Sequence, residues 1–130
     1  MMREVSNAMR DAGAEGRIVN VASAALIGSL VMGLVTYAGS KGSLLGMSGA
    51  AAMELAEHKI TVNTLLPGGV ATPGSMGAQG PAPEGPARRM PPLGFCEPRD
   101  MGNAVLFFVS PAARYVTNQV LTVDAGWSVT

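Results

Sequence analysis

Three short apolar runs, separated by helix-length segments, constrain the fold of this 130-residue chain most strongly. The runs lie at residues 17–22, 59–66 and 119–124. The first is β-branched and nearly all apolar, which is typical of a buried strand. Because helix-length segments connect the runs, we expect parallel strands joined by right-handed crossovers. The pattern therefore predicts an α/β fold with a parallel sheet between layers of helices.

Two of the connecting helices have clear boundaries. Residues 2–12 carry apolar side chains on one face and are followed by glycine. Another helix should open at residues 97–100 (Glu-Pro-Arg-Asp), because Pro98 suits a first turn and acidic groups favour the positive end of a helix. Its expected inward face comprises Met101, Ala104, Val105, Phe108 and Val109.

The expected middle helix, residues 37–57, contains glycine at positions 39, 42, 46 and 49. Each interior glycine costs a helix about 1 kcal/mol relative to alanine. Small side chains also allow another backbone to approach closely. We therefore expect a tightly packed helix that faces both the sheet and a neighbouring subunit. A flexible linker is the alternative, which the interspersed leucine and methionine residues disfavour.

Composition excludes several classes of protein. Hydrophobic residues make up 48% of the chain, and nine basic side chains balance nine acidic ones, which argues against disorder and against a nucleic-acid partner. The longest apolar stretch, residues 21–35, is too short and too interrupted to span a membrane. The single cysteine, Cys96, cannot form an internal disulfide, and no Cys/His set has metal-ligand spacing. With no signal peptide visible, a single cytoplasmic domain is expected.

Tyr37 and Lys41 are the first candidates for catalysis. They lie four residues apart, so on a helix they share one face. A cation held a few Å from a phenol favours the tyrosinate, and a phenol tuned in this way can exchange a proton with a carbonyl or alcohol oxygen. The same spacing also occurs by chance on many helices, as a half-exposed pair without a function.

Four segments, in the same order, resemble the C-terminal half of the short-chain dehydrogenase/reductase (SDR) family. They are residues 16–23 (Gly-Arg-Ile-Val-Asn-Val-Ala-Ser), 37–41 (Tyr-Ala-Gly-Ser-Lys), 62–72 (Val-Asn-Thr-Leu-Leu-Pro-Gly-Gly-Val-Ala-Thr) and 116–126 (Val-Thr-Asn-Gln-Val-Leu-Thr-Val-Asp-Ala-Gly). The resemblance covers essentially all of residues 1–130. It implies a Rossmann-type three-layer α/β/α domain, of which this chain holds the last three strands.

The resemblance also implies an oxidoreductase that moves hydride between NAD or NADP and a small-molecule alcohol or ketone. It makes Tyr37 the acid–base residue and Lys41 the residue that tunes it and binds the nicotinamide ribose. Ser23 matches the serine that holds the substrate oxygen, and Ser29 is a weaker match. The residues alone favour a simpler role for Ser23, as a strand-end hydroxyl that caps a turn.

Pro67, Gly68, Val70 and Thr72 match the family loop that meets the nicotinamide carboxamide. This agrees with the binding of ligands beyond the carboxyl ends of parallel strands, although a plain turn would explain the glycines equally well. Residues 73–94 match the family's substrate loop, and their few charges suggest a substrate that is small or mostly apolar. Asn118 and Ala125 stand where the family commonly has glycine, and we expect only local effects there.

The sequence lacks the glycine-rich phosphate loop, the residue that selects NAD or NADP, and the preceding Asn-Asn-Ala-Gly strand. The strand at residues 17–22 should therefore have an unpaired apolar edge. We interpret the chain as the catalytic half of a parent enzyme, expected to be a homodimer or homotetramer. The alternative is a truncated, non-catalytic remnant that only associates with related subunits.

Three further residues are weaker candidates. His58 lies near the expected end of a helix, where a solvated position is favoured. Cys96 has no basic neighbour in the sequence that would activate its thiol. Trp127 is expected to be a packing or interface residue.

Overall fold

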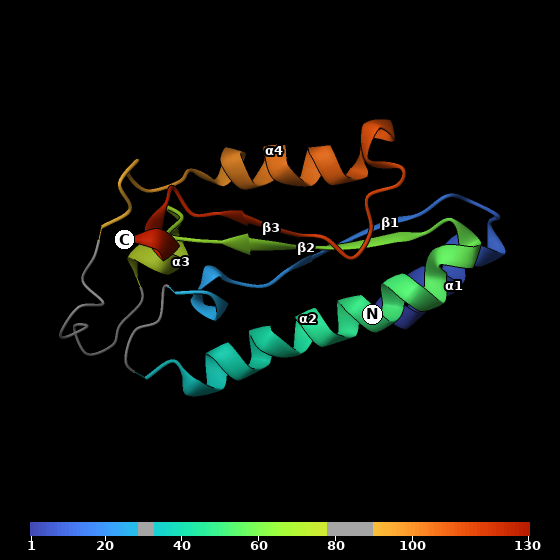
Figure 1. Ribbon diagram of the computed structural model, residues 1–130, viewed down its shortest axis with the longest axis horizontal. Coiled ribbons are helices and arrows are strands. Elements are labelled where there is room, and N and C mark those ends of the chain that lie inside the picture. The colour runs from blue at the N-terminus through green and yellow to red at the C-terminus, as the bar shows by residue number, and fades with distance from the viewer. Residues whose placement is uncertain (29–32, 78–89) are drawn as a thin grey trace.

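The computed structural model describes residues 1–28, 33–77 and 90–130 (Figure 1). Ser29 and most of the expected substrate loop lie outside the described residues. With η denoting a 3₁₀ helix, the elements in chain order are α1 (Met2–Asp11), β1 (Arg17–Val21), η1 (Ala24–Leu26), α2 (Val35–Leu55), η2 (Ala56–His58), β2 (Thr61–Pro67), α3 (Pro73–Met76), α4 (Pro98–Val109), η4 (Pro111–Ala113), β3 (Val120–Val123) and η5 (Trp127–Val129).

The three strands form a parallel sheet in the order β1-β2-β3. Val21 lies opposite Leu65, and Thr64 lies opposite Val120. In Figure 1, α4 covers one face of the sheet, and α1 and α2 lie on the other. These three layers confirm the predicted α/β/α architecture with its last three strands side by side. Among the described residues, no helix is long and apolar enough to cross a membrane.

The core of the domain is centred on β2. Its Val62, Leu65 and Leu66 side chains are at most 1% exposed, because β2 has a strand on each side and helices on both faces. Residues 17–21 form the predicted strand β1, which has the predicted unpaired edge in the described sheet, but the prediction that this strand is buried is wrong. Residues 17–20 are half-buried and Val21 is 47% exposed, because β1 is an edge strand of the described sheet.

A serine on α2 holds this helix against two strands. The Ser48 Oγ accepts hydrogen bonds from Asn20 Nδ2 on β1 (2.8 Å) and from Thr64 Oγ1 on β2 (2.9 Å). It donates its own proton to the Leu44 carbonyl oxygen at 2.7 Å. All the hydrogen-bonding capacity of this buried hydroxyl is therefore used to fix α2 across the sheet.

The glycines of α2 divide into two pairs. A Cβ built at Gly42 would lie 3.7 Å from the Leu26 side chain, and one at Gly49 would lie 3.6 Å from Asn118 Oδ1. At Gly39 and Gly46, no described heavy atom other than the adjoining residues and nearby backbone of α2 itself lies within 4 Å of such a Cβ. Within the described chain, only Gly42 and Gly49 therefore face packed neighbours. The contact of this helix with a neighbouring subunit stays a prediction.

The predicted start of α4 is confirmed. Glu97 and Asp100 form a capping box, in which Asp100 Oδ2 accepts the Glu97 backbone N–H at 2.7 Å. Ala104 and Phe108 of the predicted inward face are buried, and Met101 and Val105 are half-buried. Val109 is 43% exposed and was predicted wrongly, because one residue beyond Phe108 the helix has already turned by about 100°.

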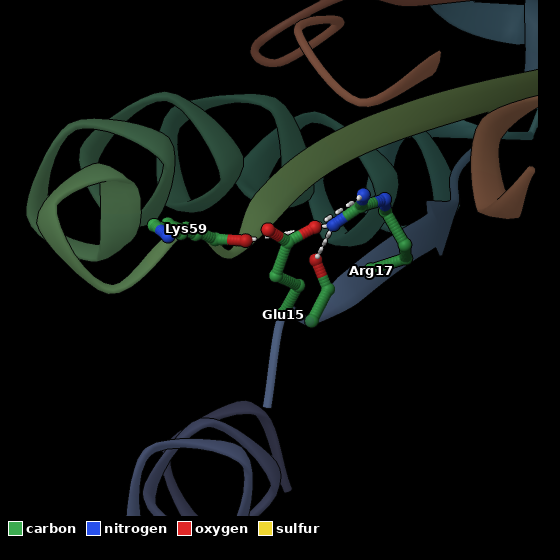
Figure 2. A network of polar contacts seen from close by, with 4 residues as sticks. Glu15, Arg17 and Lys59 are labelled. Atoms are coloured by element: carbon green, nitrogen blue, oxygen red, sulfur yellow. Dashed lines mark hydrogen bonds and ion pairs between the residues drawn. The ribbon is translucent and has the colours of Figure 1, made fainter. Parts of the chain in front are cut away.

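At the end of the sheet where β1 and β2 begin, the Arg17 side chain links two chain segments (Figure 2). Its Nη1 donates to the Gly16 carbonyl oxygen at 2.9 Å and reaches the Lys59 carbonyl oxygen at 3.5 Å. Its Nη2 lies 3.5 Å from Glu15 Oε2. The guanidinium thus joins the segment before β1 to the left-handed turn at Lys59 that leads into β2.

Candidate functional site

The carboxyl ends of the three strands bring together chain segments that are distant in sequence. Ser23 follows β1, Gly68 follows β2 and Asp124 follows β3. Figure 1 shows the start of α2, helix α3 and the C-terminus at this same end of the molecule. In a parallel α/β sheet this is the edge at which ligands bind.

Ser23 lies in extended backbone directly before η1. Its Oγ accepts the Ala25 backbone N–H at 3.2 Å and so caps the 3₁₀ helix. The turn-capping role that the residues alone favoured is therefore present. The half-buried hydroxyl keeps its own proton available for a second hydrogen bond.

Tyr37 and Lys41 lie together on the first turns of α2. The Lys41 Nζ is 5.9 Å from the centroid of the Tyr37 ring, and 42% of Tyr37 is exposed. Nζ also donates to the Val21 carbonyl oxygen at 3.1 Å. Because Val21 ends β1, two residues before Ser23, this hydrogen bond ties the Tyr37–Lys41 pair to the loop that carries the serine.

The loop after β2 approaches the end of β3 very closely. The Gly68 N–H donates to the Val123 carbonyl oxygen at 3.0 Å. A Cβ at Gly68 would lie 2.5 Å from the Asp124 Cβ and 2.6 Å from its Cα. Only glycine permits this contact, so the expected Pro-Gly turn is also a packing requirement. Pro67 itself is the last residue of β2, opposite Val123.

Val70 and Thr72 continue this loop. Val70 forms a bridge with Cys96, flanked by hydrogen bonds from Ala71 N to Cys96 O and from Cys96 N to Gly69 O, each 2.9 Å. The Thr72 Oγ1 accepts the Ser75 N–H at 3.1 Å and caps the short helix α3. These hydrogen bonds fix the conformation of residues 68–72 at the strand ends.

Asp124 organises the turn that follows β3. Its carboxylate accepts the backbone N–H groups of Gly126 (3.0 Å) and Ser128 (2.8 Å). Burial raises the pKa of this carboxyl, but the hydrogen bonds from Ser128 and Gly126 together outweigh burial and leave the pKa below its usual value.

The two residues that replace the family's glycines both have left-handed backbone. Asn118 has a φ of 54° and Ala125 a φ of 55°. Asparagine tolerates this conformation well, whereas alanine brings its Cβ close to the following carbonyl oxygen. This explains the glycines expected at these positions and leaves a small local strain at Ala125.

Two aromatic residues near the strand ends were not identified as site residues from the sequence. The rings of Phe95 and Trp127 pack edge to face, with centroids 6.3 Å apart and an interplanar angle of 84°. Together with Gly69 they line a cleft of about 530 Å³, whose described lining is Gly68, Gly69, Val70, Ala71, Ser75, Phe95 and Trp127. The sequence carried no signal for this pair, because only the fold brings the two residues together.

The other weak candidates have ordinary surroundings. Cys96 is buried, and burial, followed by the nearby charges of Asp100 and Asp124, raises the pKa of its thiol. This is the reverse of what a reactive cysteine needs. The His58 Nε2 lies 3.6 Å from Glu57 Oε1 at the end of η2. No group of three or more potential metal ligands is found within residues 1–28, 33–77 and 90–130.

Comparison with known proteins identifies the family. Residues 1–128 match the family model described as enoyl-(acyl carrier protein) reductase. The chain is 35% identical over 115 residues to the 2,5-dichloro-2,5-cyclohexadiene-1,4-diol dehydrogenase LinX of Sphingobium indicum, covering 88% of this chain and 45% of that protein. It is 37% identical over 112 residues to the 3-oxoacyl-[acyl-carrier-protein] reductase FabG of Thermotoga maritima, covering 85% and 45%.

Solved structures agree with this result. The structure of 4-hydroxyisoleucine dehydrogenase complexed with NADH superimposes with a TM-score of 0.75 at 25% identity, covering 99% of this chain and 53% of that one. The chain belongs to the short-chain dehydrogenase/reductase family, a family of oxidoreductases with a Rossmann-type fold. It spans about half the length of the curated relatives it matches.

Proposed function

We propose that residues 1–130 carry the catalytic half of an NAD- or NADP-dependent dehydrogenase/reductase that interconverts a secondary alcohol and a ketone. The observation that carries this proposal is the position of Tyr37 and Lys41. In a chain of this family, they lie side by side at the carboxyl end of the sheet and are tied by Lys41 to the end of β1.

Each polar side chain has a distinct proposed role. Tyr37 gives its phenolic proton to the carbonyl oxygen during reduction and takes a proton from the alcohol during oxidation. Ser23 donates its free O–H proton to the same substrate oxygen, because its Oγ lone pair already caps η1. The Lys41 ammonium, 5.9 Å from the centroid of the Tyr37 ring, places a positive charge beside this proton-transfer group.

The residues present fit a nicotinamide nucleoside. Lys41 uses one of its three N–H donors on Val21, which leaves two for the ribose hydroxyls. The loop of Pro67, Gly68, Val70 and Thr72 is the proposed contact for the carboxamide. When bound, the nicotinamide supplies or accepts the hydride. The part of the domain that would receive the pyrophosphate, and choose between NAD and NADP, is proposed to come from the parent protein.

The relatives support the class of substrate. One is named as a dehydrogenase of a cyclic diol and the other as a reductase of a 3-oxoacyl group, so both names describe chemistry at an alcohol or a ketone. A cytoplasmic location and a homodimeric or homotetrameric parent belong to the same proposal. A second candidate, association with related subunits without catalysis, is favoured by the half-exposed edge strand β1.

Cofactor binding tests the proposal. Calorimetry with NADH and with NADPH should be performed on the parent protein and on residues 1–130 alone, after circular dichroism has shown that each is folded. Saturable binding that is weakened at least about tenfold (1.4 kcal/mol) by Lys41→Met, but not by the control Lys59→Met, is expected. A folded chain that binds neither nucleotide would instead favour the association-only alternative for this polypeptide.

A further inference from the structure

The cleft beside Gly69 has flat aromatic walls and a glycine floor. A Cβ at Gly69 would lie 2.8 Å from both the Phe95 and the Trp127 ring, so the two rings rest directly on the glycine backbone. Phe95 is 53% exposed and Trp127 is half-buried, so neither ring is fully used in filling the core. An edge-to-face pair of this kind offers a rigid apolar surface to a ligand.

We propose that Phe95 and Trp127 determine substrate specificity, and that their cleft selects a compact apolar ring carrying the alcohol or ketone over a polyol or sugar. This inference rests on the oxidoreductase function proposed above and deepens it. It assigns a specificity role to two residues outside the Ser23, Tyr37 and Lys41 set.

The polarity of the cleft supports an apolar ligand. No charged side chain is among the described residues that line it. The Ser75 hydroxyl is already engaged, because it donates to the Val70 carbonyl oxygen at 2.6 Å and accepts the Thr72 N–H at 3.1 Å. A polyol would therefore leave hydroxyl groups without partners on this described lining, whereas the carbon atoms of an apolar ring have no hydrogen bonds to lose on entering.

The position of the cleft connects it to the catalytic side chains. Gly28, in the loop that carries Ser23, approaches the C-terminal turn so closely that a Cβ there would lie 2.9 Å from the Ser128 carbonyl oxygen. Ser128 directly follows Trp127 in η5. The loop with the serine and the turn with the aromatic wall are therefore neighbours, as a substrate that spans both requires.

The fluorescence of Trp127 provides a direct test, because Trp127 is the only tryptophan of the chain. The folded chain is titrated with cyclohexanone and, separately, with myo-inositol as a ring of similar size that carries hydroxyl groups. A saturable change in Trp127 emission is expected with cyclohexanone and none with myo-inositol. Phe95→Ala should weaken cyclohexanone binding at least about tenfold by removing one wall.

Two further variants complete the experiment. Phe107→Ala is the matched control, since Phe107 is similarly exposed, at 47%, but lies on α4 outside the cleft lining. It should leave the titration unchanged. Gly69→Ala, which brings a methyl group against both rings, should abolish the response; circular dichroism establishes that the variant is folded.

The outcomes separate this inference from the proposed function. An equal response to myo-inositol, or cyclohexanone binding that is unchanged in Phe95→Ala, would overturn the inference. So would a Trp127 response to NADH combined with none to cyclohexanone, which would assign the cleft to the cofactor and leave the dehydrogenase proposal standing. Failure of the dehydrogenase proposal shows elsewhere, in turnover that is insensitive to Tyr37→Phe.

Discussion

The two sides of the candidate site are held in very different ways. On one side, Gly68 packs against the backbone of Asp124, whose carboxylate in turn binds two backbone N–H groups. On the other side, Tyr37 is 42% exposed, and Lys41 reaches the sheet through its hydrogen bond to Val21. The loop after β2 is therefore closely packed against the end of β3, whereas the side chain of Tyr37, the proposed proton donor, remains half-exposed. Substitutions on the two sides should separate activity from stability.

The largest effect is expected at Tyr37. In the active parent enzyme, Tyr37→Phe should lower turnover by about 10²–10⁴-fold, the usual contribution of a general acid–base group. The free energy of unfolding should change by less than about 0.5 kcal/mol, as for most surface substitutions. Tyr115→Phe is the matched control, because Tyr115 is 86% exposed and lies after η4. Steady-state rates and denaturant unfolding measure both quantities. An active Tyr37→Phe enzyme would contradict the assignment.

The opposite behaviour is expected at Gly68. Gly68→Ala forces a methyl group against the Cα and Cβ of Asp124 and should destabilise the chain by about 1–3 kcal/mol, as overpacking does. Gly46→Ala is the control, since its Cβ meets no described atom and alanine favours a helix by about 0.5–1 kcal/mol. Urea unfolding should show a loss for the first variant and a gain for the second. Equal stabilities would show that the close approach at Gly68 is not retained in solution.

Much of the fold could be predicted from the sequence because it depends on local patterns. The β-branched runs and the helix-length connections predicted the parallel sheet, and Pro98 with its acidic neighbours predicted the start of α4, whereas only the resemblance to the family implied that the three strands lie side by side. The residues of β1 alone wrongly predicted that it is buried, because a strand's exposure depends on how many neighbours it has, and only the missing preceding strand indicated its open edge. Helix α3 was missed because its capping box uses Ser75 in place of glutamate or glutamine.

The candidate site was predictable to a similar degree. Tyr37 and Lys41 share a helix face, so their proximity follows from a spacing of four residues. The pairing of Phe95 with Trp127 depends on β3 lying beside β2, which no local pattern encodes. In the same way, Gly68 could be recognised as a turn residue from the sequence, but its contact with Asp124 could not.

Ionisation of Asp124 is expected to make the free energy of unfolding depend on pH, with an effect of intermediate size. Because its folded pKa is lowered, its carboxylate stabilises the native state above the unfolded value of about 3.9, and this contribution is lost as the pH falls through the folded pKa. Asp124→Ala should cost about 1.5–3 kcal/mol at neutral pH, as for hydrogen bonds to a charged group. Denaturant unfolding between neutral and strongly acidic pH measures both stabilities. The difference between wild type and variant should shrink on acidification, and a constant difference would exclude this role.

The smallest effect is expected at Ala125, which lies next to Asp124. Here the substitution should raise the free energy of unfolding instead of lowering it. A left-handed alanine costs about 1–2 kcal/mol, and glycine removes that strain while adding about 0.4–1 kcal/mol of unfolded-state entropy. Ala125→Gly should therefore stabilise the chain by about 0.5–1 kcal/mol, seen as a higher denaturation midpoint with an unchanged m value. Ala12→Gly is the control, because Ala12 has a φ of −78° and carries no such strain, so the same change should destabilise the chain. If both variants were destabilised, the C-terminal turn would not require left-handed backbone at Ala125. The turn between β3 and Trp127 would then form without the backbone strain that the Ala125 φ of 55° implies.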